Sequence, residues 1–275
     1  MFIFIIVILV RGFLISLTDA QGFEPGEFIG LENFKEIIKD DWFWKSVINT
    51  SKFAVACILT QIPAGLLLAS GLNQIRNKKL QGMLAAAFFI PYLMNSVIIA
   101  QMFNLLFSGE PGLVNWFLGL LHLPNDFQWT FDPHLSFPLL VFVAFWQGVG
   151  LPTIYFLTYY RTIDPMLYEA AAIDGATPFR KFFCITLPLM RPAILFMVVT
   201  TAASCMLIFD LVFMLFRRGV GENVVSIIMY IYWRGFSGDF ELGVAAAAGW
   251  LAFFIILTVS LIQIKVIGLG KPNEN

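Results

Sequence analysis

Residues 169–188 of this chain read EAAAIDGATPFRKFFCITLP and lie between two long apolar segments. The stretch continues a run of good helix formers that starts at residue 166, and Gly175 follows that run where a helix end often needs a positive φ. Thr177 then offers an N-cap, and Pro178 stands at the first helical position, where its missing N–H costs nothing. The sequence therefore predicts a helix, a tight turn and a second helix between two segments that are long enough to enter a membrane.

The composition of the whole chain is that of a membrane protein. Of its 275 residues, 59% are hydrophobic and 13% are charged, and its mean hydropathy is +0.82. A soluble domain carries about 25% charged residues, so we expect membrane lipid to be the main solvent of this chain. The formal net charge of −1, without a basic run in the sequence, points away from nucleic acid as a partner.

Six apolar stretches reach, or nearly reach, the length of about 20 residues that a membrane-spanning helix needs. They are residues 1–17, 53–72, 84–107, 136–159, 193–216 and 242–267. Polar connections with glycine or proline separate the inner stretches, so unpaired backbone groups there can reach water. We therefore expect an all-α integral membrane protein, a bundle of six spans.

The first stretch is the shortest and carries Arg11. It has no basic n-region and no small-residue cleavage site, so a retained helix is favoured over a signal peptide. A charge inside a span usually faces other protein or a water-filled cavity. Two alternatives stay open: the span is displaced so that Arg11 reaches an interface, or the native start lies upstream of Met1.

The positions of Lys and Arg in the connections predict the topology. One side of the membrane would hold Arg76, Lys78, Lys79, Arg161, Arg180, Lys181, Arg191, Lys265 and Lys271. The connections on the other side are acidic or mixed, so both termini are expected in the cytoplasm. The predicted parts are a first transmembrane helix (1–18), an external segment (19–52), a core transmembrane domain (53–267) with a cytoplasmic loop (161–191), and a cytoplasmic tail (268–275). Within the external segment, residues 31–41 have apolar spacing suited to a surface-lying helix.

The cytoplasmic loop resembles the EAA loop of the membrane subunits of bacterial ABC importers. The residues that carry the resemblance are Glu169, Ala170, Ala171, Asp174, Gly175, Ala176, Phe182, Ile185, Leu187 and Pro188. In that family a short helix of the loop docks on a partner ATPase, so the resemblance implies that these residues couple the chain to ATP hydrolysis. The helix signals alone fit an ordinary amphipathic connector equally well.

Further motifs extend the resemblance to nearly the whole chain, and they are those of sugar permeases of the maltose-transporter type. They are GLENF at 30–34, FW at 43–44, NT at 49–50, FFIPY at 88–92, WQGVG at 146–150, YIY at 230–232 and FELGVAAA at 240–247. The resemblance implies the type I ABC importer permease fold and, as partners, a second homologous permease subunit, two ATPase subunits and an extracytoplasmic solute-binding protein. ATP and Mg would be bound by the ATPase, so no cofactor is expected on this chain.

One segment departs from that family. Where many relatives have a Gly-Gly-Gly-Pro turn after the fifth span, residues 217–222 read RRGVGE. The two arginines either meet an acidic surface of the binding protein or belong to a solvated loop.

The sequence contains no pattern that would make the chain an enzyme. It has no Gly-x-x-x-x-Gly-Lys-Ser/Thr phosphate-binding loop, so ATP would be hydrolysed by another chain. The two histidines and three cysteines lack the spacing of a metal site: His122, His134, Cys57, Cys184 and Cys205. We therefore expect a pore-forming subunit with neither catalytic residues nor a bound metal.

Candidates for the substrate path lie in the fourth and fifth spans, because transport sites form near mid-membrane where broken helices line a cavity. Resemblance to the maltose-type permease places sugar-facing positions at Ala144, Gln147, Gly148, Leu151, Cys205 and Ile208, and polarity at apolar depth adds Ser204 and Asp210. Gln147 and Ser204 are expected to face each other, with the glycines beside Gln147 leaving room for a sugar ring. The alternative at each position is helix packing through small residues.

The leading hypothesis is a permease subunit of an ATP-driven, binding-protein-dependent importer in the bacterial or archaeal plasma (inner) membrane, with a sugar or oligosaccharide as cargo. One alternative changes the cargo to glycerol 3-phosphate or a polyol phosphate, which would favour fixed cations along the route, and only Arg11 lies inside a span. Another is a stand-alone, proton-coupled secondary transporter. It would predict repeat symmetry and intramembrane acids, and it leaves the EAA loop unexplained.

Overall fold

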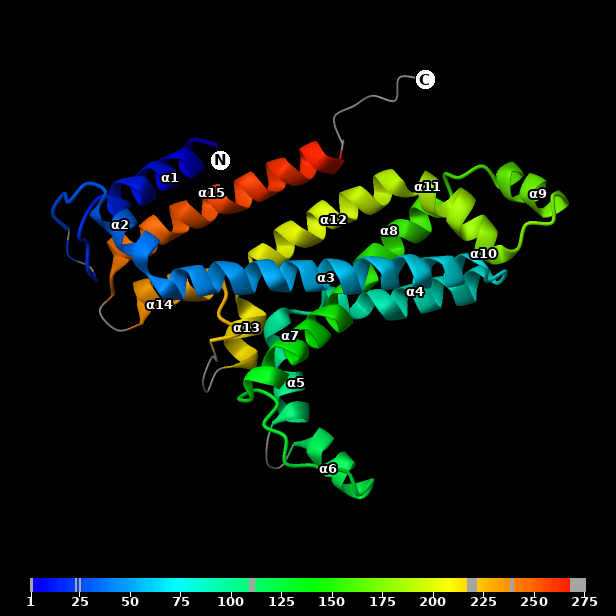
Figure 1. Ribbon diagram of the computed structural model, residues 1–275, viewed down its shortest axis with the longest axis horizontal. Coiled ribbons are helices and arrows are strands. Elements are labelled where there is room, and N and C mark those ends of the chain that lie inside the picture. The colour runs from blue at the N-terminus through cyan, green and yellow to red at the C-terminus, as the bar shows by residue number, and fades with distance from the viewer. Residues whose placement is uncertain are drawn as a thin grey trace.

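A computed structural model describes residues 2–22, 24, 26–108, 112–216, 222–237 and 240–267. All regular elements in these ranges are helices, accompanied by two isolated bridges, Thr18 with Phe28 and Gln21 with Glu241 (Figure 1). The predicted all-α fold is confirmed. The predicted tail, 268–275, and residues 217–221 of the departing segment lie outside the described residues.

The helices follow one another along the chain with short connections. They are α1 (Phe2–Ser16), α2 (Glu32–Lys39), α3 (Asp41–Asn73), α4 (Lys78–Leu93), α5 (Ser96–Phe107), α6 (Leu113–Leu120), α7 (Pro133–Gly148), α8 (Gly150–Tyr160), α9 (Pro165–Ile173), α10 (Pro178–Lys181), the π-helix η1 (Phe182–Thr186), α11 (Leu187–Leu189), α12 (Arg191–Met206), α13 (Asp210–Leu215), α14 (Ile227–Phe236) and α15 (Leu242–Ile267).

Two single helices, α3 and α15, are long and apolar enough to cross a membrane. The bounds of α15 agree with the predicted sixth span, but α3 begins at Asp41, well before the apolar run predicted from residue 53. Asp40 accounts for this early start because its carboxylate accepts the Trp42 N–H at 2.8 Å as an N-cap. The predicted external segment therefore contains the first turns of α3.

Three further spans are bent pairs of helices. The axes change direction by 93° between α4 and α5, by 41° between α7 and α8, and by 67° between residues 178–189 and α12. Asn95 stabilises the first break by accepting the Val97 N–H at 2.8 Å, which caps the new helix. With the shorter apolar helix α1, the described residues hold six candidates by length and composition, but the third bent pair begins at Pro178, inside the predicted loop 161–191, and ends before residue 216.

The predicted fifth span, residues 193–216, is not one helix. α12 ends at Met206 and α13 begins at Asp210, because Phe209 leaves the helical region with φ −136° and ψ −63°. The Ser226 hydroxyl donates to the Ile208 carbonyl at 2.8 Å and so satisfies one backbone group that the break leaves unpaired. No glycine or proline marks this break in the sequence.

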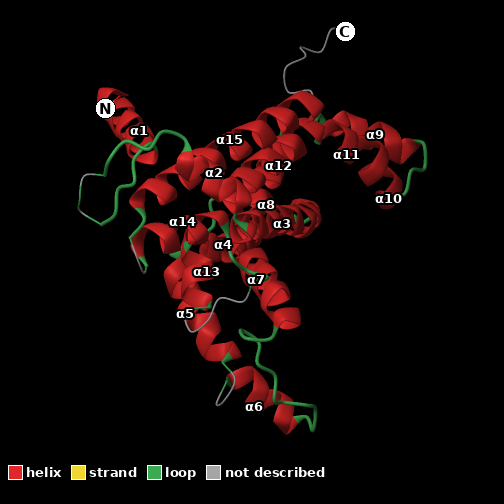
Figure 2. Cartoon of the chain, turned by 60° about the vertical axis from the view of Figure 1, so that its left-hand side comes forward, coloured by secondary structure: helices red, strands yellow, loops and turns green. Residues whose placement is uncertain are grey.

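Asn33 holds helix α2 against the end of α1. Its side-chain amide donates to the carbonyls of Ser16 at 2.9 Å and Thr18 at 2.8 Å. Gly243, at the start of α15, permits this approach, because a Cβ there would lie 2.1 Å from the Thr18 oxygen. α2 confirms the predicted surface helix, and Figures 1 and 2 show α1 beside α15.

Candidate functional site

A cavity of about 270 Å³ lies where the bent spans meet α3. Its lining includes all seven residues predicted for the substrate path and Ala144: Gln147, Gly148, Leu151, Ser204, Cys205, Ile208 and Asp210. The other lining residues are Phe53, Gln61, Tyr92, Ser96, Pro152, Thr200, Thr201, Leu207, Phe209 and Leu211. Positions from seven helices, far apart in the sequence, therefore share one space.

The cavity coincides with the helix breaks. Residues that flank the breaks between α4 and α5, α7 and α8, and α12 and α13 all contribute to its lining. Non-helical backbone at membrane depth is tolerated where it lines a cavity or is buried in protein. Breaks of this kind place backbone polar groups and helix ends beside a transported solute.

Gln147 ties α7 to the break between α4 and α5. Its side-chain Nε2 donates to Ser96 Oγ at 3.0 Å and to the Met94 carbonyl at 3.3 Å. Gln147 and Ser204 line the same cavity, and that they face each other across it stays a prediction. The amide nitrogen of Gln147 thus holds the cavity wall, which leaves its carbonyl oxygen as the group with acceptor capacity to offer a solute.

The space beside Gly148 is filled by Gln61 of α3. A Cβ on Gly148 would lie 2.7 Å from both Nε2 and Oε1 of Gln61, and this Nε2 donates to the Ala144 carbonyl at 3.1 Å. The expectation that this glycine leaves room for a sugar ring is therefore wrong. At Gly150 a Cβ would lie 2.2 Å from the Phe88 carbonyl oxygen, so this glycine serves close packing of α8 on α4.

Sequence reasoning missed three polar residues of the cavity. Gln61, Tyr92 and Ser96 line it, although they lie in the second and third predicted spans. Gln61 is an amide within the apolar run 53–72, and this is a signal that could have found it. Ser96 follows Asn95, an N-cap residue type, which marks a helix start inside an apolar stretch.

Asp210 is the one charged side chain among the described lining residues. It stands in the first turn of α13 and is exposed to the cavity side of the helix break. A carboxylate is favoured at the N-terminal end of a helix. The other polar groups of the lining are uncharged amides and hydroxyls, which suit hydrogen bonding to a neutral solute.

The loop of residues 161–191 forms the predicted helix, turn and helix. Asp164 caps α9 by accepting the Met166 N–H at 2.9 Å, and Thr177 caps α10 by accepting the Arg180 N–H at 3.3 Å. Gly175 has φ +71°, in the left-handed region that favours glycine. The π-helix η1 after α10 was not predicted.

This loop lies at one end of the molecule, away from the centre of the bundle (Figures 1 and 2), and it exposes apolar side chains. α9 buries none of its residues, and Ile173 is 87% exposed, Phe179 74% and Met166 71%. Among the predicted coupling residues, Phe182 and Leu187 pack against the buried cluster of this end, whereas Glu169, Ala170, Asp174, Gly175 and Pro188 are exposed. Exposed apolar surface of this kind marks an interaction site.

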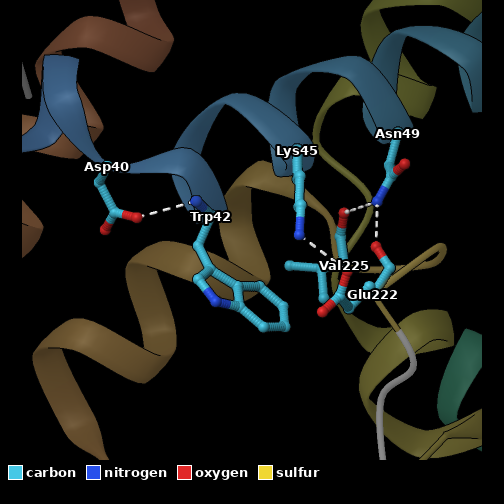
Figure 3. Close-up of polar contacts among 6 residues, drawn as sticks. All are labelled: Asp40, Trp42, Lys45, Asn49, Glu222 and Val225. Carbon is cyan, nitrogen blue, oxygen red and sulfur yellow. Dashed lines mark hydrogen bonds and ion pairs between the residues drawn. The ribbon is translucent and has the colours of Figure 1, made fainter.

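The opposite end holds a polar junction between α3 and the segment that leads to α14 (Figure 3). Lys45 Nζ lies 2.8 Å from the Glu222 carboxylate, and the Asn49 side-chain amide donates to the carbonyls of Glu222 at 2.6 Å and Val225 at 3.4 Å. These bonds hold the backbone from Glu222 to Val225 against α3, at the end of the segment 217–222 that differs from the resembling family.

Comparisons with known proteins give one consistent family. Residues 61–268 match the family described as "Binding-protein-dependent transport system inner membrane component". The trehalose/maltose transport system permease protein MalF of Thermococcus litoralis is 30% identical over 265 residues, 96% of this chain and 88% of that protein. The probable starch degradation products transport system permease protein AmyD of Thermoanaerobacterium thermosulfurigenes is 31% identical over 269 residues, 94% of this chain and 88% of that protein.

Two solved structures are similar to this chain. A bacterial ABC transporter involved in the import of the acidic polysaccharide alginate has a TM-score of 0.84 at 24% identity, over 96% of this chain and 89% of that chain. The bacterial alginate ABC transporter in complex with an alginate pentasaccharide-bound periplasmic protein has a TM-score of 0.78 at 26% identity, over 86% of this chain and 81% of that chain.

Proposed function

The chain belongs to the family of binding-protein-dependent transport system inner membrane components, and from this premise we propose that it forms half of the pore of an ATP-driven importer of neutral oligosaccharides or sugars. The single observation that carries the proposal is the cavity at the breaks between α4 and α5, α7 and α8, and α12 and α13. It joins uncharged hydrogen-bonding side chains to the broken backbone that a transport site needs.

The cargo is proposed from the chemistry of the lining. Amide and hydroxyl groups such as Gln61, Ser96 and Thr201 match sugar hydroxyls, which donate and accept hydrogen bonds. The only charge in the described lining is the carboxylate of Asp210, which would repel a phosphate or a uronate. The names of the permeases similar to this chain, for trehalose or maltose and for starch degradation products, support a sugar cargo.

The exposed loop supports the proposal that ATP hydrolysis is supplied by a partner. Its apolar surface around Ile173 and Phe179 would be covered by an ATPase subunit that binds ATP and Mg. A second homologous permease would complete the pore, and an extracytoplasmic solute-binding protein would deliver the cargo. This arrangement places both termini of the chain in the cytoplasm of a bacterial or archaeal cell.

A competition assay tests the cargo. Vesicles that contain the complete complex take up labelled maltose or trehalose, and unlabelled sugars, alginate oligosaccharides and glycerol 3-phosphate are added in excess. We expect neutral sugars to compete and the two anionic compounds to have no effect. Uptake of labelled glycerol 3-phosphate would contradict the proposed cargo and favour the polyol phosphate alternative.

A further inference from the structure

A series of hydroxyl groups links α9 to the transmembrane core. The Tyr168 hydroxyl lies 2.9 Å from Thr186 Oγ1, in η1. The Tyr160 hydroxyl, at the end of α8, interacts with the same Thr186 side chain and forms a short hydrogen bond with Ser70 of α3. Ser70 Oγ donates to the Leu66 carbonyl at 2.8 Å. Two hydroxyl pairs, Tyr168 with Thr186 and Tyr160 with Ser70, thus lie in series between α9 and the backbone of α3, with Thr186 beside Tyr160.

The direction of this path follows from the single proton that each hydroxyl carries. Because Ser70 gives its proton to the Leu66 carbonyl, Tyr160 is the donor to Ser70. The Tyr160 oxygen therefore keeps acceptor capacity for the neighbouring Thr186 hydroxyl, and Thr186 can in turn accept from Tyr168. Hydrogen bonds that run in one direction polarise one another, so the loss of one group weakens the others.

The Thr186 hydroxyl is available to the hydroxyl groups of Tyr168 and Tyr160 because it does not donate to a backbone carbonyl of its own helix. Elsewhere in the described helices threonine hydroxyls donate to the carbonyl four residues earlier, as Thr153 does to Val149 at 2.7 Å and Thr200 to Phe196 at 2.9 Å. Thr186 lies in the wider turn of η1 and is buried, with 3% exposure. Single π turns of this kind occur frequently at functional sites.

Tyr168 is the side chain through which α9 contacts the core. α9 buries no residue, but half-buried Tyr168 packs against the buried cluster that contains Tyr160 and Met190. A displacement of α9 can therefore be transmitted to the helix bundle in two ways: through the backbone segments that flank α9, and through the Tyr168 side chain. The receiving helix, α3, carries both Ser70 and Gln61, with Pro63 between them, and Gln61 lines the cavity.

Resting on the proposed function, in which α9 docks on an ATPase, we propose that the hydroxyls of Tyr168, Thr186, Tyr160 and Ser70 transmit the movement of α9 to the cavity. They are positioning residues, because none of them lines the cavity. The chain of bonds keeps α9 in register with α3, so that ATP-driven motion of the loop changes the access to the cavity. Without the chain, the ATPase would turn over while the cavity responds incompletely.

The test measures cavity access in the complete complex. A reporter, Ser204→Cys, is placed in a chain whose Cys57, Cys184 and Cys205 are replaced, and its labelling by a water-soluble maleimide is compared with and without Mg-ATP and vanadate. In Tyr168→Phe we expect ATP hydrolysis to be retained. The change in labelling rate on trapping should fall by about two-fold to ten-fold, the size expected for one lost hydrogen bond.

Matched variants separate transmission from stability. Tyr159→Phe alters a neighbouring half-buried tyrosine of the same cluster whose hydroxyl forms no hydrogen bond among the described residues, and it should behave like the unaltered chain. Thr186→Val should reproduce the defect of Tyr168→Phe, and Thr186→Ser should restore the response. A parallel loss of co-purification, hydrolysis and labelling change in Tyr168→Phe would contradict transmission, since it would indicate a structural role.

The outcomes also distinguish this proposal from the one on which it rests. If the unaltered complex shows no change in labelling on trapping, the importer proposal fails, and the hydroxyl chain fails with it. If the unaltered complex responds and Tyr168→Phe responds equally, the hydroxyl chain alone is contradicted.

Discussion

At the scale of single residues, the cavity depends on close contacts that glycine permits. Gly148 gives space to Gln61, and Gly150 lets α8 approach the backbone of α4 at Phe88. Both glycines belong to a motif that resembles sugar permeases, and the structure assigns each one a neighbour instead of an empty space. Their role is to bring polar groups and helix ends together.

We predict that Gly150→Ala destabilises the protein. The new Cβ would lie 2.2 Å from the Phe88 carbonyl oxygen, and the backbone of α4 must shift to accommodate it. Overpacking of this kind costs about 1–3 kcal/mol of unfolding free energy. Thermal unfolding of the purified complex measures it, with Gly82→Ala as the control, because a Cβ at Gly82 of α4 meets nothing within 4 Å. Equal stability of the two variants would contradict the packing role.

We predict that Gln147→Ala weakens transport several-fold without abolishing it. The change removes the bonds to Ser96 and to the Met94 carbonyl, and each such bond contributes only about 0.5–1.5 kcal/mol net. The uptake rate in vesicles measures the effect, and Gln101→Ala, an exposed glutamine outside the cavity lining, is the control. Full activity of Gln147→Ala would show that this side chain is dispensable for the cavity wall and for the solute.

The sequence indicated the cavity residues of two spans but not their partners. Polarity at apolar depth, together with the resemblance to the maltose-type permease, selected Gln147 and Ser204 in the fourth and fifth spans. The contact of Gly148 with Gln61 joins two spans that are distant in sequence, and no local pattern encodes such a meeting. Tertiary packing therefore brings the missed residues, Gln61, Tyr92 and Ser96, to the cavity lining.

At the scale of elements, two junctions each depend on one residue. Asn33 holds α2 against the end of α1, and Gly175 turns the chain between α9 and α10. Near α2, burial and the hydrogen bond to Asp40 at 2.6 Å raise the pKa of Tyr230, so its phenol stays protonated and donates.

We predict that Asn33→Ala loosens α1. The change removes the Asn33 side-chain amide, so the carbonyls of Ser16 and Thr18 lose their donor. An unsatisfied buried group costs about 1–3 kcal/mol of stability. Limited proteolysis between α1 and α2 should become faster. Glu32→Ala, at an exposed neighbouring position, should leave the cleavage rate unchanged. An unchanged rate of proteolysis in Asn33→Ala would contradict the role of Asn33 in holding α2 against the end of α1.

We predict that Gly175→Val uncouples the chain from its ATPase. A β-branched residue is strained at φ +71°, although a Cβ there meets nothing within 4 Å, so the turn would be displaced without a clash. Membrane insertion should remain normal because the loop lies outside the spans. Gly175→Asn is the matched control, since asparagine tolerates the left-handed region. Co-purification of the ATPase and normal transport with Gly175→Val would oppose this account.

Helix ends were predictable where capping residues mark them, and the break between α12 and α13 was not. Thr177, Pro178 and Gly175 gave the loop correctly because their chemistry is local. The break at Phe209 has neither glycine nor proline, and a tertiary contact from Ser226 supports it. Breaks that are stabilised from outside the segment leave no signal within it.

At the scale of the whole molecule, two regions interrupt the long helices: the cavity and the loop that contains α9 and α10. The cavity gathers three helix breaks, and the loop of α9 and α10 stands apart at one end (Figure 1). The unbroken helix α3 connects them, with Gln61 at the cavity and Ser70 at the hydroxyl chain. This arrangement fits a subunit that moves in response to a partner.

The most direct test of the central claim is solute uptake by vesicles that contain defined sets of components. The chain is reconstituted alone and together with the partner permease, the ATPase and the solute-binding protein, and labelled maltose or trehalose is supplied outside. The account predicts uptake only when all components and Mg-ATP are present, and neither uptake nor ATP hydrolysis by this chain alone. Sustained uptake by the chain alone, driven by a proton gradient, would contradict it.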